Sequence, residues 1–498
     1  MSHVSEPTEE GPGASKPTPE ESAMYVSRTD LVAVEDEGYH KALKNRHIQM
    51  IAMGGAIGTG LFLGAGSRLA SAGPSLAIVY AISGVFAFLV VRAMGELVMH
   101  RPTTGSFVSY SREFYGEKAA FAAGWLYFLN WATSGIADVT AAAVYVKFFA
   151  PHVPQWIPAL IALFVVLAIN LVSVKLFGEL EFWFAAIKVA AIVIFMIIAI
   201  VVLVIRHPVD GVTTGPQLIA ANGGIFPHGA FAALLILQGI VFAYAGIEMV
   251  GVTAGEAAEP RKIIPKAVNA VGWRIAIFYV GSIILLVMLL PWNVYKDGES
   301  PFVTFLTKLG IPSAGGIMDL VILTAALSSV NSGLYSTGRI LRSLSVNGAA
   351  PKFTGRIGRN GVPYSGVLLT AGIYLLGILL DVFVPGDAFN IALDYSALGI
   401  IGMWIMIMLA NLGLQRRAKQ GYLTRPAYRL PGAPYTNYLT IIFLVAVFAL
   451  SWYDKDGRIM VIGSPGIAIL MIIGWFAVRK RVGEVKRRPL PGQGAKTG

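Results

Sequence analysis

Apolar residues recur along the chain in runs long enough to cross a lipid bilayer. A membrane-spanning helix needs about 20 consecutive, mostly apolar residues, and such runs follow one another from residue 48 to residue 478. Only short polar stretches separate them, and one globular core cannot hold so many. The pattern predicts an all-α polytopic membrane protein. Twelve spans are expected, at residues 48–71, 74–98, 119–147, 156–174, 182–205, 231–257, 271–291, 314–338, 364–384, 389–412, 435–453 and 459–478.

Glycines interrupt two of these runs at corresponding places. The first run contains Gly54-Gly55 and Gly58-Thr59-Gly60, and the sixth contains "FAYAGIEMVG" at 242–251. Glycine costs about 1 kcal/mol relative to alanine in a helix interior, so both stretches are expected to be unwound. Broken helices at matching positions are typical of inverted-repeat transporters. This predicts a 5+5 repeat, at about 48–205 and 231–412, followed by two appended helices at 435–478.

An unwound segment inside a membrane needs polar partners, because each unpaired N–H or C=O group there costs several kcal/mol. Free N–H groups at the start of a half-helix suit a carboxylate, and free carbonyls suit an ammonium. The breaks are therefore expected to bind a small zwitterion. The alternative is that the glycines only let helices pack closely, as small residues do in membranes.

Charge is sparse and unevenly distributed. Charged residues make up 13% of the chain, against about 25% in soluble proteins. With the N-terminus in the cytoplasm, most Lys and Arg side chains fall on the inner side, which is the positive-inside asymmetry. It predicts an even number of spans, both termini cytoplasmic, in the cell (inner) membrane. Topology explains the net charge of +11, so no nucleic-acid partner is expected.

The ends of the chain differ in composition from the middle. Residues 1–39 are polar and rich in Pro, Ser and Glu, which predicts a disordered cytoplasmic tail without the apolar core of a signal peptide. The membrane transport domain is expected at 40–482, with a C-terminal cytoplasmic tail at 483–498. The chain has no cysteine, and its seven histidines are scattered. No disulfide, metal site, cofactor, ATP-binding motif or enzyme activity is expected.

Several sequence blocks resemble a known transporter family. They are "GGAIGTGLFLGAG" (54–66), "GELVMHRPTTGSFVSYSREFYGEKAAFAAGWLYFLNW" (95–131), "EFWFAAIKVAAIV" (181–193), "FAYAGIEMVGVTAGEAAEPRK" (242–262) and "NSGLYSTGRIL" (331–341). In these the chain resembles the amino acid transporters of the amino acid–polyamine–organocation superfamily. The stretches 37–55 and 100–114 are most similar to the members that carry L-asparagine.

The resemblance implies a fold similar to that of the leucine transporter, with the substrate between the two breaks. It places the substrate carboxylate at Ile57–Gly60 and the amino group at carbonyls of Phe242–Gly246. It makes Phe242 an aromatic outer gate, against the alternative of a core- or lipid-facing ring. The substrate-binding residues expected on this basis and from their positions are Ile57, Gly58, Thr59, Gly60, Phe242, Ala243, Tyr244, Gly246, Glu248 and Asn130.

Lys188 is expected to couple transport to protons. A lysine inside a span is expensive and usually functional, and burial favours its neutral form. The family resemblance places it beside the break of span 1, where sodium-driven members hold their ion. Because it lies about six residues into the predicted span 5, snorkelling to the interface is the alternative.

Each of the other polar residues inside the predicted spans has two alternative roles. Glu248 follows the second break and is expected either to shape the pocket or to support a neighbouring helix end. Asn130 and Asp138 lie two turns apart in span 3. Each is expected either to meet the substrate side chain or to join neighbouring helices. Ser328 and Ser329 lie where sodium-driven relatives bind sodium, while helical Ser often bonds its own backbone.

The function expected is therefore import of L-asparagine, or a similar small neutral amino acid, with a proton. Other substrates such as GABA or proline, sodium coupling, and exchange on the same fold remain open. A non-transporting amino-acid sensor is disfavoured by the short polar tails. The amino acid and the lipid bilayer are the partners expected, and the sequence does not define an oligomeric state.

Overall fold

The structure, a computed structural model, describes residues 35–39, 41–55, 57–150, 152–311, 313–383 and 387–486. Of the predicted tails at 1–39 and 483–498, residues 1–34 and 487–498 lie outside the described residues. Within the described part the chain forms helices and loops, with two isolated β-bridges and no strand. The α-helices are α2 (Asn45–Gly54), α3 (Thr59–Phe62), α4 (Gly64–Ala72), α5 (Ser75–His100), α6 (Ser106–Tyr115), α7 (Glu117–Phe149), α8 (Trp156–Val172), α9 (Val174–Val204), α10 (Gln217–Ala221), α11 (Gly229–Leu235), α12 (Leu237–Ala243), α13 (Met249–Val252), α14 (Pro260–Arg274), α15 (Ser282–Leu289), α16 (Pro301–Lys308), α17 (Ala314–Val346), α18 (Tyr364–Phe383), α19 (Asp387–Lys419), α20 (Tyr435–Leu450) and α21 (Lys455–Lys486).

The described helices confirm a polytopic all-α membrane protein. Seven of them, counting α14 and α15 together as one span, are long and apolar enough to cross a bilayer, and the bent pair Asn45–Phe62 and Gly64–Ala72 gives an eighth. The helices α8 and α18 are apolar but shorter. Each predicted run coincides with one of these helices or with a group of them.

Two boundaries differ from the prediction. Helix α9 begins at Val174, eight residues before the predicted start of span 5 at 182. Lys188 is therefore the fifteenth residue of its helix, about 21 Å from the start at 1.5 Å per residue. Helix α14 begins at Pro260, eleven residues before the predicted start of span 7 at 271. Pro260 opens α14, where its missing N–H has no helical role, and Pro265 follows within the same helix.

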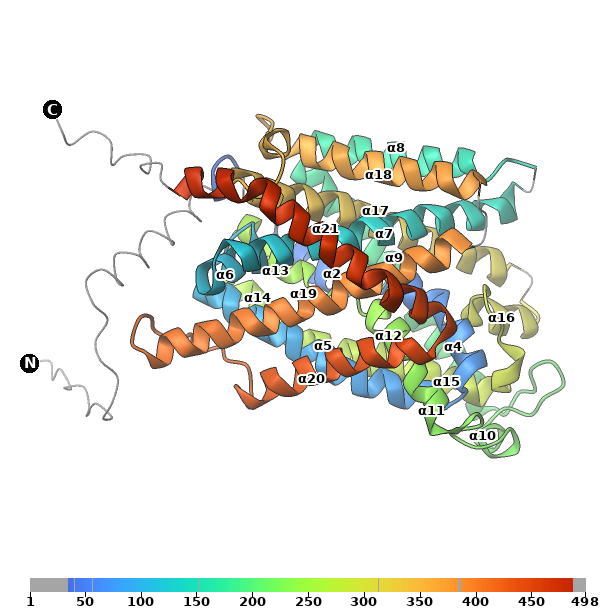
Figure 1. Ribbon diagram of the computed structural model, residues 1–498. Coiled ribbons are helices and arrows are strands. Elements are labelled where there is room, and N and C mark those ends of the chain that lie inside the picture. The colour runs from blue at the N-terminus through green and yellow to red at the C-terminus, as the bar shows by residue number, and fades with distance from the viewer. Residues whose placement is uncertain are drawn as a thin grey trace, which may run out of the picture.

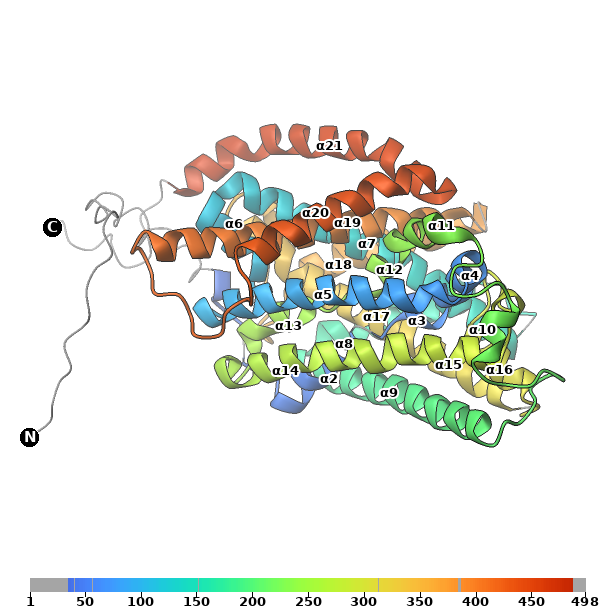
Figure 2. The same cartoon turned by 90° about the horizontal axis from the view of Figure 1, so that it is seen from below.

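The long helices run side by side in one bundle (Figure 1). Helix α7 packs extensively on α17 and α19 in the centre, and α2 packs on α9 and α14. The two last helices lie outside this core, and α21 curves over the opposite face from α9 and α14 (Figure 2). Only 6% of the apolar window of α21 is buried, so this helix presents its side chains to lipid.

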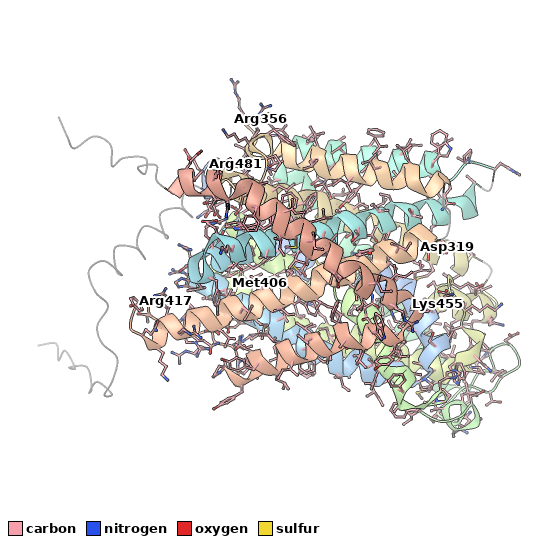
Figure 3. All side chains as sticks on the ribbon, in the orientation of Figure 1. Asp319, Arg356, Met406, Arg417, Lys455 and Arg481 are labelled. Atoms are coloured by element: carbon pink, nitrogen blue, oxygen red, sulfur yellow. The ribbon has the colours of Figure 1, made fainter. Side chains whose placement is uncertain are left out.

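Basic side chains gather at one end of the bundle. Figure 3 shows Arg356, Arg417 and Arg481 toward one end, and Asp319 and Lys455 toward the other. At the basic end Arg481 donates from Nε to the carbonyl of Gly348 at 2.8 Å, which fixes α21 to the turn after α17. These three arginines belong to segments that the charge pattern predicts to be cytoplasmic.

The segment Glu35–Tyr39 caps this basic end. Glu35 is 1% exposed and pairs with Arg112, and the amide of Asn347 donates to it at 2.7 Å. The guanidinium groups of Arg339 and Arg342 lie over the Tyr39 ring, and burial raises the pKa of Tyr39 to about 12. Glu35, which falls within the predicted tail at 1–39, is therefore held in the bundle, because the buried Arg112 needs an acidic partner.

Glu256 anchors the same end, and its loss should destabilise the fold. It is fully buried, pairs with Arg339 and accepts from the Tyr335 hydroxyl at 3.1 Å. Glu256→Gln should cost about 3–5 kcal/mol, because it leaves the buried guanidinium without its counter-charge. Thermal unfolding of the detergent-solubilised protein measures this. Glu259→Gln is the matched control, since the pair of Glu259 with Lys262 is exposed and worth at most about 1 kcal/mol.

Candidate substrate site at two broken helices

The first break lies between α2 and α3. Helix α2 ends at Gly54, and at Gly58 the backbone is extended, with φ −123° and ψ −168°. Helix α3 begins at Thr59, and the chain bends by 56° before α4. The backbone N–H groups in this interval lie outside a continuous helix. They therefore need hydrogen-bond partners other than the carbonyls of a preceding helical turn.

The second break lies between α12 and α13. The helix ends at Ala243, a turn follows, and helix resumes at Met249. Gly246 adopts φ +91° within the turn, a conformation that only glycine adopts without strain. Both breaks occur where the sequence predicts them.

The glycines of the breaks permit backbone-to-backbone contact. A Cβ added to Gly246 would lie 2.5 Å from the carbonyl oxygen of Gly55, and one added to Gly60 would lie 2.7 Å from Cα of Ala243. A Cβ on Gly54 would lie 2.3 Å from Cβ of Ala185, whereas one on Gly58 would meet nothing within 4 Å. Close packing at Gly54, Gly60 and Gly246 is therefore combined with open space at Gly58.

A small chamber lies between the two breaks, with a volume of about 30 Å³. A water molecule needs about 10–15 Å³ by the same kind of measure, so the chamber as it stands has room for only two or three waters. A bound amino acid requires its walls to move apart. The chamber is lined by Gly54, Gly55, Ile57, Gly58, Thr59, Gly60, Asn130, Trp131, Ser134, Lys188, Phe242, Ala243, Ala245, Ala325, Ser328, Ser329 and Ser332.

Lys188 lies in the chamber wall and not at the membrane interface. Its side chain is 1% exposed, and Nζ donates to the Gly54 carbonyl at 2.6 Å and to the Ser328 hydroxyl at 2.9 Å. Ser328 in turn donates to Glu181, which also accepts from Asn331 at 3.0 Å. An ammonium has three donors, so one remains beyond these two partners.

Asp138 and Asn130 both belong to α7 and differ in their relation to the chamber. Asp138 is 1% exposed and accepts from the Thr59 hydroxyl at 2.9 Å. Asn130 lines the chamber directly, and its side-chain carbonyl accepts from Ser396 at 2.7 Å. The buried amide nitrogen of Asn130 has no hydrogen-bond partner among the described residues, which is costly unless a ligand or water meets it.

Three expected binding residues lie outside the chamber lining. Tyr244 is fully buried, and its hydroxyl donates to the Tyr80 carbonyl at 2.8 Å. Its ring packs on Tyr80 and Tyr279, so the Tyr244 side chain does not line the chamber. Gly246 contacts the other break, and Glu248 accepts from the Gly246 N–H at 3.2 Å. Glu248 therefore braces the turn.

The sequence prediction missed several polar chamber residues. Ser134 follows Asn130 by four positions and precedes Asp138 by four, so one face of α7 carries all three. Ser332 follows Ser328 by four positions on α17. Helical spacing from the named residues would have found both. Glu181 lies seven positions before Lys188, again on the same face.

A wider vestibule of about 400 Å³ adjoins the chamber at Phe242. Thr59, Gly60 and Phe242 line both the vestibule and the chamber, so these three residues form the boundary between the two cavities. Asp454 also lines the vestibule. It is next in sequence to Lys455, which lies at the end of the bundle away from the basic end (Figure 3). Arg68 donates to the Gly60 carbonyl at 2.8 Å from the vestibule side.

Truncation of Phe242 should open the chamber. The natural chain has no cysteine, so a Ser329→Cys variant reports access to the chamber without background. Adding Phe242→Ala should make its reaction with an external thiol reagent about tenfold faster, which corresponds to a barrier lower by about 1.4 kcal/mol. Ser67→Cys, in the vestibule, should react at the same rate with or without Phe242→Ala. An unchanged rate at position 329 would contradict a separating role for Phe242.

Comparison with known proteins gives the family. The amino acid permease family model matches residues 47–487. The chain is 56% identical to an L-asparagine permease of Streptomyces coelicolor over 461 residues, 92% of this chain and 94% of that protein. It is 53% identical to the L-asparagine permease of Escherichia coli over 474 residues, 95% of each chain. L-asparagine permease 2 of Mycobacterium tuberculosis is 56% identical over 455 residues, 91% of this chain and 93% of that protein. These relatives are named as permeases and not as enzymes, and the chain belongs to the amino acid permease family.

Proposed function

We propose that this protein imports L-asparagine together with a proton by alternating access. The names of relatives at 53–56% identity over more than nine-tenths of the chain support the substrate. The observation that carries the mechanism is the chamber between two broken helices, with the Lys188 amine in its wall.

The chamber suits both ends of a zwitterion. Amide groups around Gly58 and the start of α3 offer N–H donors to the carboxylate. On the opposite side, the end of α12 at Ala243 offers carbonyls to the ammonium group. The Ala243 carbonyl already accepts from the Tyr279 hydroxyl at 2.8 Å, which leaves its second lone pair for a ligand.

Lys188 is proposed as the coupling group. Its amine donates hydrogen bonds to the Gly54 carbonyl and the Ser328 hydroxyl. A sodium ion at this place would need these two oxygens as ligands. Protonation adds a charge between the first break and α17. Glu181 is linked to the amine through the Ser328 hydroxyl, and Asp138 is the second acidic group that attracts this charge. Gain and loss of this proton would shift the position of α2 relative to α9. That shift would favour opening of the site toward one side of the membrane over the other.

The topology proposed is twelve spans in the cell membrane with both termini in the cytoplasm. The breaks fall in the first and sixth spans and cross at Gly55 and Gly246, which supports a 5+5 inverted repeat with α20 and α21 appended. With the basic end inside, the vestibule opens outward and Phe242 closes over the chamber. A cycle then consists of entry past Phe242, widening of the chamber, and opening between α2 and the capped inner end.

Uptake of labelled L-asparagine into proteoliposomes tests the proposal. An inward proton gradient, and in a separate arm an inward sodium gradient, is imposed, with unlabelled asparagine, GABA, proline, glutamine and aspartate as competitors. Accumulation driven by protons alone, and blocked by asparagine but not by GABA or proline, supports it. Accumulation driven by sodium, uptake only into preloaded vesicles, or binding without flux would replace it with a sodium symporter, an exchanger or a sensor.

A further inference from the structure

Asp138 collects three hydroxyl groups from three helices. Its Oδ1 accepts from Thr59 of α3 at 2.9 Å, and its Oδ2 accepts from Ser134 of α7 at 3.2 Å and from Ser329 of α17. Thr59, Ser134 and Ser329 line the chamber, whereas Asp138 does not. The carboxylate therefore lies behind a wall made of these three hydroxyls, the hydroxyl wall.

The carboxylate fixes the direction in which the hydroxyl wall can bond. A hydroxyl has one donor hydrogen and two acceptor lone pairs, and an ionised carboxylate can only accept. Each hydroxyl of the wall therefore gives its hydrogen to Asp138. Only lone pairs remain for the chamber, so this wall accepts hydrogen bonds from a ligand and offers none.

A donor lies on the same helix face two turns away. Asn130 precedes Ser134 by four positions and Asp138 by eight, so the three side chains follow one face of α7. The side-chain carbonyl of Asn130 accepts a hydrogen bond from Ser396. The buried amide nitrogen of Asn130 has no hydrogen-bond partner among the described residues. The chamber thus presents one unused amide donor beside three hydroxyl acceptors.

We infer that Asp138 makes the chamber selective for a side-chain carboxamide over a carboxylate. A carboxamide carries one carbonyl acceptor and two N–H donors, which match the Asn130 amide nitrogen and the hydroxyl wall. A side-chain carboxylate has no donor, meets lone pairs there, and lies close to a second negative charge. This inference rests on the proposed function, because it requires the substrate to occupy the chamber once Phe242 has moved.

Asp138→Asn tests the inference. The amide that replaces the carboxylate can donate to the hydroxyls, so they become free to donate into the chamber. The ratio of kcat/KM for labelled L-asparagine to that for labelled L-aspartate should fall at least about tenfold, which is the scale of discrimination that one polar contact gives. A higher KM for asparagine and a gain in aspartate uptake should both contribute.

Asp319→Asn is the matched control. Asp319 is also a buried aspartate inside a long helix, 7% exposed on α17, but it lines a different cavity with Tyr145. This variant should keep the wild-type ratio. Ser134→Ala is the second variant, because it removes one acceptor and leaves Asp138 in place. It should raise the KM for asparagine several-fold, and it keeps the test decisive if Asp138→Asn does not fold.

The outcomes distinguish a failure of this inference from a failure of the proposed function. If wild-type protein accumulates asparagine but Asp138→Asn lowers all uptake at an unchanged ratio, Asp138 only joins α3, α7 and α17 and the inference is wrong. The same holds if Ser134→Ala leaves the KM for asparagine unchanged in a folded protein. If the wild-type protein takes up no asparagine, the proposed function itself fails.

Discussion

Gly246→Ala should abolish transport, with uptake falling about 100-fold or more. The added Cβ would lie 2.5 Å from the Gly55 carbonyl oxygen, and the residue would have to hold φ +91°. Positive φ costs about 1–3 kcal/mol for a side-chain residue, and overpacking costs about as much again. Both penalties fall on the point where the two breaks cross. Initial uptake rate per amount of folded, purified protein measures the effect.

Two matched glycines separate the clash from other causes. Gly421 has φ +80° but nothing within 4 Å of an added Cβ, so Gly421→Ala carries the backbone strain alone. Gly372 lies in α18 with open space at its Cβ position, so Gly372→Ala carries neither cost. Both variants should transport at near wild-type rates. Normal transport by Gly246→Ala would show that the two breaks do not need their close approach.

Lys188→Gln should remove proton-driven accumulation. A glutamine amide can still donate to the Gly54 carbonyl and Ser328, but it cannot change charge. A gradient of one pH unit supplies about 1.4 kcal/mol per proton, which is about tenfold accumulation. The wild-type protein should approach this value, and the variant should only equilibrate the substrate. Time courses of labelled asparagine in proteoliposomes, with and without the gradient, measure it.

Counterflow distinguishes uncoupling from inactivity. If Lys188→Gln still exchanges labelled external for unlabelled internal asparagine, the site works and only the coupling is lost. Lys308→Gln is the control, because Lys308, at the end of α16, pairs with Asp210 where both side chains are partly exposed, and this variant should keep tenfold accumulation. Full gradient-driven accumulation by Lys188→Gln would overturn the coupling role.

Hydropathy and glycine placement carry most of the fold information in this sequence. Apolar runs mark the helices because the bilayer requires length and apolar composition together. The glycines predict both breaks because a mid-membrane interruption needs close approach or positive φ, as at Gly55 and Gly246. Local signals of this kind do not depend on which helices become neighbours.

Side-chain direction depends on those neighbours, and there the sequence was less informative. Tyr244 lies within the second break, yet its hydroxyl turns to the Tyr80 carbonyl of α5. Asp138 received its hydroxyl partners from α3 and α17, 79 and 191 positions away. The start of α9 at Val174 also escaped prediction, because Lys175 and the acidic residues Glu179 and Glu181 resemble a loop in composition. In the fold, Glu179 meets Arg46 and His47, and Glu181 is buried.

The most direct test of the central claim is a structure determined with L-asparagine bound. The account predicts the amino acid in a widened chamber, with its α-carboxylate at residues 57–60, its ammonium near the Ala243 carbonyl and its carboxamide between Asn130 and the hydroxyl wall. The Lys188 amine should remain beside the Gly54 carbonyl or have moved with the first break. An amino acid held only in the vestibule outside Phe242, with the chamber unchanged, would contradict the account.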